Sequence, residues 1–259
     1  MSASPELPTH AEQISQLKNQ WLELPAKHWQ LLRLAPLANE RGNGARPLRF
    51  AELARSERHS PGLSLLRLKV QLPAQQLYKE QNSLEIWLDH TLRTIQFGPE
   101  NGLQVEPCNR GLGRFLIAQG ILWAQQRCAQ YKVVGDDFTA KDSFEESLRN
   151  RRDNVLEALG FAITYKDDAH IKGSYGANTL GDLRGEWNSE KLQVISLLDA
   201  ASMLQQAEQL LAEQVIKLRQ KDDQLAASKR DEGALRFTIS SLVIFCLFQA
   251  ALLFWLIVR

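Results

Sequence analysis

The chain has 259 residues, of which 44% are hydrophobic and 24% are charged, and its formal net charge is +1. This length predicts one domain of ordinary size with additional elements. A near-neutral chain with only short basic clusters gives no reason to expect nucleic acid as a partner, because nucleic-acid-binding domains present a basic face. Its three cysteines, Cys108, Cys128 and Cys246, are too few for a disulfide framework and are typical of a reducing compartment.

The first part of the chain predicts helices and a strand. Apolar residues recur at helical spacing over residues 10–34, where Pro25 interrupts them, and shorter helices are expected at residues 50–57 and 75–90. Residues 63–72 lie between Pro-Gly and Pro, and their apolar, partly alternating pattern predicts a strand.

The middle of the chain predicts a hairpin that leads into a phosphate-binding turn. Residues 91–97 and 103–107 flank a turn rich in Gly, Pro and Asn, as hairpin strands do. The second of these strands runs into a glycine-containing turn that opens an apolar helix at residues 114–130. Free N–H groups and the helix dipole bind phosphates at such a place. Gly111 and Gly113 would let a ligand approach the backbone closely.

Three further elements follow this helix. A buried strand is expected at residues 131–134, a helix at about residues 144–159 that stops at Gly160, and another strand at residues 161–165. The order is therefore strand, phosphate-type turn, helix, strand, helix and strand.

Two motifs in this region resemble those of the GNAT superfamily of N-acetyltransferases. Residues 105–113 read Val-Glu-Pro-Cys-Asn-Arg-Gly-Leu-Gly, which matches each fixed position of the family's Val-x-Pro-x-x-Arg-Gly-x-Gly. Residues 159–161 read Leu-Gly-Phe, which matches the end of a family helix, and Asn150 and Asn154 lie upstream as in the family's Asn-containing stretch. The two motifs occur in the family's order and span residues 103–165.

The resemblance implies an α/β fold with a mixed α+β sheet that splays open between its fourth and fifth strands. Acetyl-CoA or another acyl-CoA would be the substrate in the gap, with its pyrophosphate on backbone N–H groups and its pantetheine on the strand edge. Glu106 would be catalytic and would help to remove the amine proton, although a solvated strand residue is the alternative reading. The cofactor-binding residues implied by the resemblance are Val105, Arg110, Gly111, Leu112, Gly113, Arg114, Phe115, Asn150 and Asn154. No metal is expected, because the histidines lack the spacing of metal ligands.

Two residues depart from the family pattern. Phe115 stands where the glycine motif ends in a small residue, and its side chain would either crowd the pyrophosphate or point into the core. Leu156 stands where many members carry a tyrosine that protonates the leaving thiolate. Two functions therefore remain open: an N-acyltransferase that acts on a protein or small amine, and a catalytically silent binding or scaffold protein of the same fold.

A long helical stalk is expected after this domain. Leucines recur every seven residues at Leu197, Leu204, Leu211, Leu218 and Leu225, which is typical of a coiled coil. Residues 189–229 contain neither Gly nor Pro, and residues 231–233 are expected to break the helix. We expect homo-oligomers through residues 190–228; packing of this helix back on the body is the alternative.

The C-terminal segment predicts a single membrane span. Residues 237–258 carry no formal charge, and a helix of this length spans roughly 33 Å, close to the hydrocarbon thickness of a lipid bilayer. Lys229, Arg230 and Arg236 precede the span and only Arg259 follows it, so the positive-inside rule puts the body in the cytoplasm. The expected organisation is an N-terminal segment at 1–20, the acyl-CoA-binding domain at 21–188, the coiled-coil stalk at 189–232 and the tail anchor at 237–258.

Overall fold

The computed structural model describes residues 10–21, 24–37, 46–73, 81–98, 102–138, 146–167, 170 and 172–258. The chain divides into two compact units, Met1–Ser196 and Leu197–Arg259. The first unit is a mixed α+β domain built on a nine-stranded sheet. The second unit is one long helix. A mixed sheet followed by a long C-terminal helix, as the sequence predicts, is confirmed.

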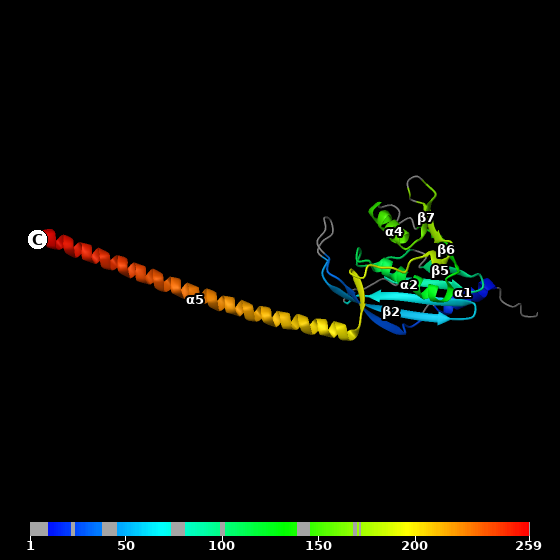
Figure 1. The fold of residues 1–259 in the computed structure, drawn as a ribbon, viewed down its shortest axis with the longest axis horizontal. Helices are drawn as coiled ribbons and strands as arrows, with labels where there is room; N and C mark the ends of the chain where they lie inside the picture. Colours follow the sequence, from blue (N-terminus) through cyan, green and yellow to red (C-terminus); the bar gives the residue numbers. More distant parts are fainter. Residues whose placement is uncertain are drawn as a thin grey trace, which may run out of the picture. The chain divides into compact units, whose positions relative to one another are not determined.

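The sheet has the strand order β7-β8-β6-β5-β4-β3-β2-β1-β9 (Figure 1). Its strands are β1 His28–Leu34, β2 Arg49–His59, β3 Leu63–Gln71, β4 Ser83–Asp89, β5 Thr94–Gly98, β6 Lys132–Asp137, β7 Ala162–Tyr165, β8 Gly173–Ala177 and β9 Leu192–Ile195. All neighbouring strands are antiparallel except β5 and β6, which are parallel. Parallel neighbours require a crossover, and helix α2 (Leu112–Cys128) lies between them in the chain.

Helices cover both faces of the sheet. On β3, Leu66 and Leu68 belong to the main core together with α2, whereas Leu63 and Leu65 pack with Trp21 beside α1 (His10–Gln20). Because successive side chains of a strand point to opposite faces, α1 and α2 lie on opposite sides of the sheet. Residues 10–20, expected as a separate segment, therefore belong to the domain.

Helix α2 packs closely against the middle of the sheet. A Cβ atom at Gly120 would lie 1.9 Å from Cδ1 of Ile86, a fully buried β4 residue, so a larger residue there would require the Ile86 side chain to move. Helix α4 (Glu146–Ala158) ends before Gly160, whose φ of +91° is the left-handed conformation of a helix C′ residue. The strand at residues 63–72, the helix after the glycine turn and the helix before Gly160 are confirmed.

Four local predictions are wrong. Residues 28–34, the end of the segment expected to be helical, form strand β1, which pairs with β2 and β9. Residues 50–57 form most of β2 rather than a helix, because pairing with β1 and β3 overrides their helical composition. Of residues 75–90, those at 83–89 form β4, and residues 74–80 lie outside the described part. Residues 103–107, expected as the second strand of a hairpin, form no strand.

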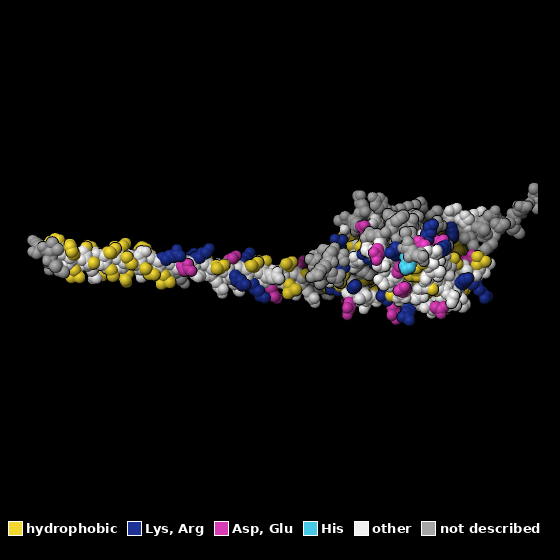
Figure 2. All heavy atoms as spheres, turned by 90° about the horizontal axis from the view of Figure 1, so that it is seen from above, with side chains coloured by type: hydrophobic (Ala, Val, Ile, Leu, Met, Phe, Trp, Pro, Cys, Tyr) yellow, Lys and Arg dark blue, Asp and Glu magenta, His cyan; other side chains and the backbone are white. Residues whose placement is uncertain are grey.

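Helix α5 (Leu197–Val258) is continuous. The expected stalk begins later than predicted, because residues 192–195 pair with β1 as strand β9 and extend the first unit to Ser196. No break occurs at residues 231–233, which are helical. In the described part of the chain α5 is long and apolar enough to cross a membrane. Figure 2 shows apolar side chains crowding its C-terminal part, after a group of basic ones.

Candidate functional site

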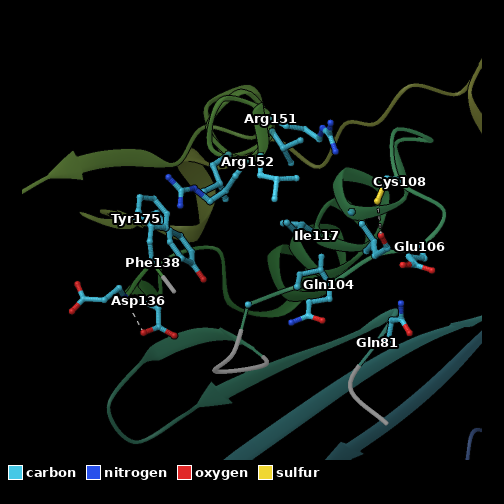
Figure 3. A pocket seen from close by; sticks show the side chains of 18 residues that line it. Gln81, Gln104, Glu106, Cys108, Ile117, Asp136, Phe138, Arg151, Arg152 and Tyr175 are labelled. Atoms are coloured by element: carbon cyan, nitrogen blue, oxygen red, sulfur yellow. Dashed lines mark hydrogen bonds between the residues drawn. The ribbon is translucent and has the colours of Figure 1, made fainter. Parts of the chain in front are cut away.

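A cavity opens where β5 and β6 part. The two strands pair only through Thr94–Gln96 and Lys132–Val134. Further along, residues 102–106 on one side and Asp136–Phe138 on the other line a cavity of about 480 Å³ (Figure 3). Residues of α2, α4 and β8 and Gln81 also line it. The cavity is bounded by Gln81, Gly102, Leu103, Gln104, Val105, Glu106, Cys108, Gly113, Ile117, Asp136, Asp137, Phe138, Leu148, Arg151, Arg152, Val155, Leu156 and Tyr175.

The N-terminus of α2 reaches this cavity. Gly111 is its N-cap, with a φ of +78° that favours glycine. The N–H of Phe115 donates to the carbonyl of Gly111 at 3.0 Å, so the preceding N–H groups of the first turn have no acceptor within the helix. Gly113 lines the cavity, and a Cβ atom there would lie 3.6 Å from Cγ2 of Val105. Backbone N–H groups and the positive end of the helix dipole therefore meet beside the cavity.

The side chains of Arg110 and Phe115 are buried in the domain and do not line the cavity. Arg110 is buried and donates to the carbonyls of Ala35 at 2.6 Å and Pro47 at 2.5 Å, which ties the glycine turn to the connection between β1 and β2. Burial, and then the charges of neighbouring arginines, lower the pKa of Arg110. Phe115 is fully buried and packs edge-on against Trp187 at 5.4 Å. Since Phe115 points into the core, it leaves the cavity open.

The residues of α4 that line the cavity are not the two asparagines that the resemblance implies. Asn150 and Asn154 are exposed and do not line the cavity. Arg151, which the sequence analysis did not single out, does line it, and in Figure 3 its side chain extends in the direction of Cys108. A role of the two asparagines in cofactor binding stays a prediction. A reading of α4 by helical period would have found Arg151, which shares a face with Leu148 and Val155.

Arg114 and Leu112 support the glycine turn from α2. The Nε of Arg114 donates to the carbonyl of Glu186 at 2.9 Å, so its side chain is held outside the cavity. Leu112 is buried in the main core. Of these two residues, only the backbone groups can contribute to an anion site.

Asn82 fixes one wall of the cavity. It is fully buried with a φ of +57°, which Asn tolerates better than most residues. Its side chain accepts from the N–H of Glu106 at 2.6 Å and donates to the carbonyl of Glu106 at 2.7 Å, while its own N–H donates to the carbonyl of Gln104 at 2.8 Å. These hydrogen bonds replace those that a neighbouring strand would make with residues 104–106.

An aromatic cluster forms the opposite wall. Tyr175 stacks on Phe138 with ring centroids 5.7 Å apart, and the guanidinium of Arg152 lies 3.5 Å from the centroid of the Phe138 ring. Tyr175 pairs across the sheet with Asp136, where β6 is irregular. A Cβ atom at Gly135 would lie 2.1 Å from the carbonyl oxygen of Tyr175, so glycine is required for β8 to come this close.

Tyr175 is also the phenol of the cavity. Figure 3 shows its hydroxyl directed toward the interior. Burial, and next the negative charge of Asp136, raise the pKa of Tyr175 to about 12, so the hydroxyl stays protonated at neutral pH.

Carboxylates occur on both walls. Glu106 is exposed and lies on the wall that leads to Cys108, whereas Asp136 and Asp137 lie at the end of β6. Asp137 forms an ion pair with Lys166 at 2.9 Å, and Asp136 accepts from the N–H of Asp137. Among the described residues, no group of His, Cys, Asp and Glu is arranged to hold a metal ion.

Comparisons with protein-family models, with curated proteins and with solved structures gave no match to this chain.

The role of Asn82 predicts a local loss of order in its variants. Asn82→Gly keeps the left-handed backbone accessible but removes the two hydrogen bonds that the Asn82 side chain makes with the backbone of Glu106. We expect stability to fall by about 1–3 kcal/mol, with faster amide hydrogen exchange at residues 104–106. Asn82→Ala should cost more, because alanine also disfavours the backbone conformation. Exchange at 104–106 as slow as in the wild type would contradict this account.

Proposed function

We propose that this protein is an acyl-CoA-dependent N-acyltransferase of the GNAT type. The single observation that carries the proposal is the cavity between the parting strands β5 and β6, with the N-terminus of α2 at its edge. The motif at residues 105–113 falls at this point of the chain. The parallel pair that opens is formed by the fifth and sixth strands rather than the fourth and fifth, because the sheet begins with one strand more than expected.

The cavity offers a place for each part of acyl-CoA. The pyrophosphate would lie on the N–H groups at Gly111–Arg114, with Arg151 as a cationic partner from α4. The pantetheine would follow the wall at Leu103–Val105, where backbone groups are held in place by Asn82. This route would bring the thioester toward Leu156 and Tyr175, which line the same cavity.

The reaction needs one proton acceptor and one proton donor. The neutral amine nitrogen attacks the thioester carbonyl carbon, the new C–N bond forms, and the C–S bond breaks. A carboxylate takes the proton that the amine loses, and the departing sulfur takes the proton of the Tyr175 hydroxyl. Asp136 is the carboxylate beside Tyr175, and Glu106 is the one on the opposite wall. The amine proton finally returns to Tyr175, so the enzyme ends unchanged.

A catalytically silent acyl-CoA-binding scaffold is the second candidate. It is favoured by Leu156, which lines the cavity without a hydroxyl group. Two observations favour the enzyme over this scaffold: Phe115 is packed in the core, and Tyr175 supplies a phenol to the same cavity.

The first prediction is that acetyl-CoA binds the full chain reconstituted in nanodiscs. Isothermal titration should give micromolar affinity, about −8 kcal/mol. Gly113→Trp should abolish binding, since the indole would fill the edge of the cavity near Val105. Leu92→Trp is the control, because Leu92 is exposed and does not line the cavity, so the same bulk there should leave affinity unchanged. Equal affinity in Gly113→Trp and the wild type would refute the site.

The second prediction concerns Tyr175. Tyr175→Phe should lower turnover by about a hundredfold or more, measured as thiol release from acetyl-CoA with a panel of lysine peptides and polyamines. Affinity for acetyl-CoA should stay the same. Because the pKa of Tyr175 is raised to about 12, its ionisation should not reduce wild-type turnover between pH 7 and about 10.

Tyr131→Phe is the control for this variant. It removes a phenol that bonds His90 at 3.1 Å and does not line the cavity. Equal losses in both variants would assign Tyr175 a structural role. Asp136→Asn and Glu106→Gln, compared in the same assay, separate the two carboxylates.

We also propose that α5 anchors the body to a membrane and associates with copies of itself. The segment at residues 237–258 supplies the span, and the basic residues before it favour a cytoplasmic body. The leucine repeat from Leu197 to Leu225 supplies an apolar seam, since its side chains are exposed on the single helix. A monomeric mass for the chain in mild detergent would contradict the association.

Membrane insertion predicts a specific sensitivity at the middle of the span. Leu247→Arg should raise the fraction extracted by alkaline carbonate, because an arginine at the bilayer centre costs roughly 2.5–3.5 kcal/mol of insertion; Leu247→Ala should remain inserted. The exposed Cys108 should react with an impermeant maleimide only after the cells are permeabilised. Labelling of Cys108 in intact cells would show that the body lies on the opposite side of the membrane.

A further inference from the structure

The leucine repeat of α5 continues beyond residue 225. In a heptad labelled a to g, the repeated leucines take position d, and steps of seven from Leu225 reach further d residues on the same unbroken helix. These d residues are Glu232, Ile239, Cys246 and Leu253. The a positions between them hold Lys229, Arg236, Val243 and Ala250. All of them are exposed on the single helix, and this face of α5, from residue 197 to residue 253, is named the long seam.

The long seam keeps facing one partner when two helices wind around each other. A straight helix drifts by about 20° per heptad from a strict seven-residue repeat, which amounts to about 60° over the three heptads from Leu225 to Cys246. Supercoiling removes this drift, so the a and d residues stay in the interface. Membrane helices commonly cross at the same angle as soluble coiled coils. Because α5 is one helix over Leu197–Val258, pairing along the stalk carries over into the span.

Charges of alternating sign occupy the long seam just before the span. Lys229 and Arg236 are a residues, and Glu232 is the d residue between them. In a parallel pair in register, a d side chain packs between the preceding and following a residues of the facing helix. Glu232 therefore lies beside Lys229 and Arg236 of the second copy. A shift by one heptad would instead place Lys229 level with Arg236, so charge complementarity selects the unshifted register.

The residue types of the long seam favour two helices. β-Branched residues at a with leucine at d are typical of parallel dimers, and a polar a residue restricts the register at a cost in stability. The a positions include Val215 and Val243, and also the acidic Glu208 and Asp222. Helices anchored in one membrane with their bodies on the same side are parallel. A second copy of this chain is therefore the partner that the long seam fits.

We propose that α5 forms a parallel dimer in register, whose interface is the long seam and runs without interruption from the stalk into the membrane span. Glu232 of each copy pairs with Lys229 and Arg236 of the other, and the Cys246 thiols of the two copies face each other. The inference rests on the proposed association of α5 and adds the number of copies, their register and the extent of the interface.

Charge reversal tests the register in the full chain in mild detergent. Glu232→Lys should weaken the dimer at least about tenfold, because three basic residues of each copy would then meet. The double variant Lys229→Glu with Arg236→Glu should weaken it likewise. A mixture of the two variants should restore a dimer, measured by co-purification of differently tagged chains, since the facing charges are again opposite. Arg230→Glu, exposed and outside the long seam, is the matched control and should leave the dimer unchanged. A mixture that associates no better than either variant alone would overturn the register.

Oxidative cross-linking tests the extent of the interface. In isolated membranes that contain the full chain with Cys108→Ser, copper-phenanthroline and dissolved oxygen should join two Cys246 thiols into a disulfide-linked dimer. Cys246→Ala with Phe248→Cys moves the thiol to position f, on the face away from the partner, and should cross-link at least about fivefold less. Cys246→Ala with Leu211→Cys provides the reference within the stalk.

The cross-linking result separates this inference from the proposed association. Cross-linking at Leu211→Cys and at Cys246, with little at Phe248→Cys, supports the long seam. Cross-linking at Leu211→Cys alone would overturn its continuation into the span and leave the association of the stalk intact. Equal cross-linking at Cys246 and Phe248→Cys would overturn the shared face. No cross-linking at Leu211→Cys or Cys246, in a chain that is monomeric in detergent, would overturn both proposals.

Discussion

β5 and β6 run parallel and share a register over only three residue pairs before they part. Peptide groups at such a parting lose their ladder partners, and buried groups without partners are costly. Each wall of the cavity has a different arrangement of its backbone at this point. On one wall, Asn82 forms hydrogen bonds with the backbone of Gln104 and Glu106. On the other wall, β6 pairs with β8, and the register of this pairing shifts between Val133 and Asp136. The cavity is the space that these two local solutions leave between them.

Arg110 and Phe115 belong to the glycine motif, yet neither side chain lines the cavity. Arg110 carries the charge of the glycine motif, yet its guanidinium is used to hold the carbonyls of Ala35 and Pro47. Phe115 anchors α2 in the core against Trp187. Both residues fix the direction of the α2 N-terminus, so its backbone N–H groups are presented in a defined position without side-chain help. Preorganised backbone donors of this kind lose little entropy when an anion binds.

The sequence was informative where structure is local. The glycine turn, α2 and the Gly160 stop depend on backbone conformations that glycine allows, and these follow from a few adjacent residues. The helix expected at 50–57 failed because β2 is set by partners on β1 and β3, which lie far along the chain. Asn82 escaped notice for the same reason, since its partner Glu106 is 24 residues away. The inward direction of Phe115 depends on the rotation of α2 about its axis, which the motif alone left open.

Under the proposed function, Leu156 and Tyr175 separate a chemical role from a position in a motif. A departing thiolate needs a hydrogen-bond donor at the place where the sulfur lies, and the chain element that carries the donor is immaterial to the reaction. Leu156 on α4 and Tyr175 on β8 line the same cavity. Leu156 gives this wall of the cavity an apolar side chain, and Gly135 allows β8 to come close to β6 at Tyr175. Under the proposed function, the apolar side chain of Leu156 is compatible with a phenol that Tyr175 supplies to the same cavity.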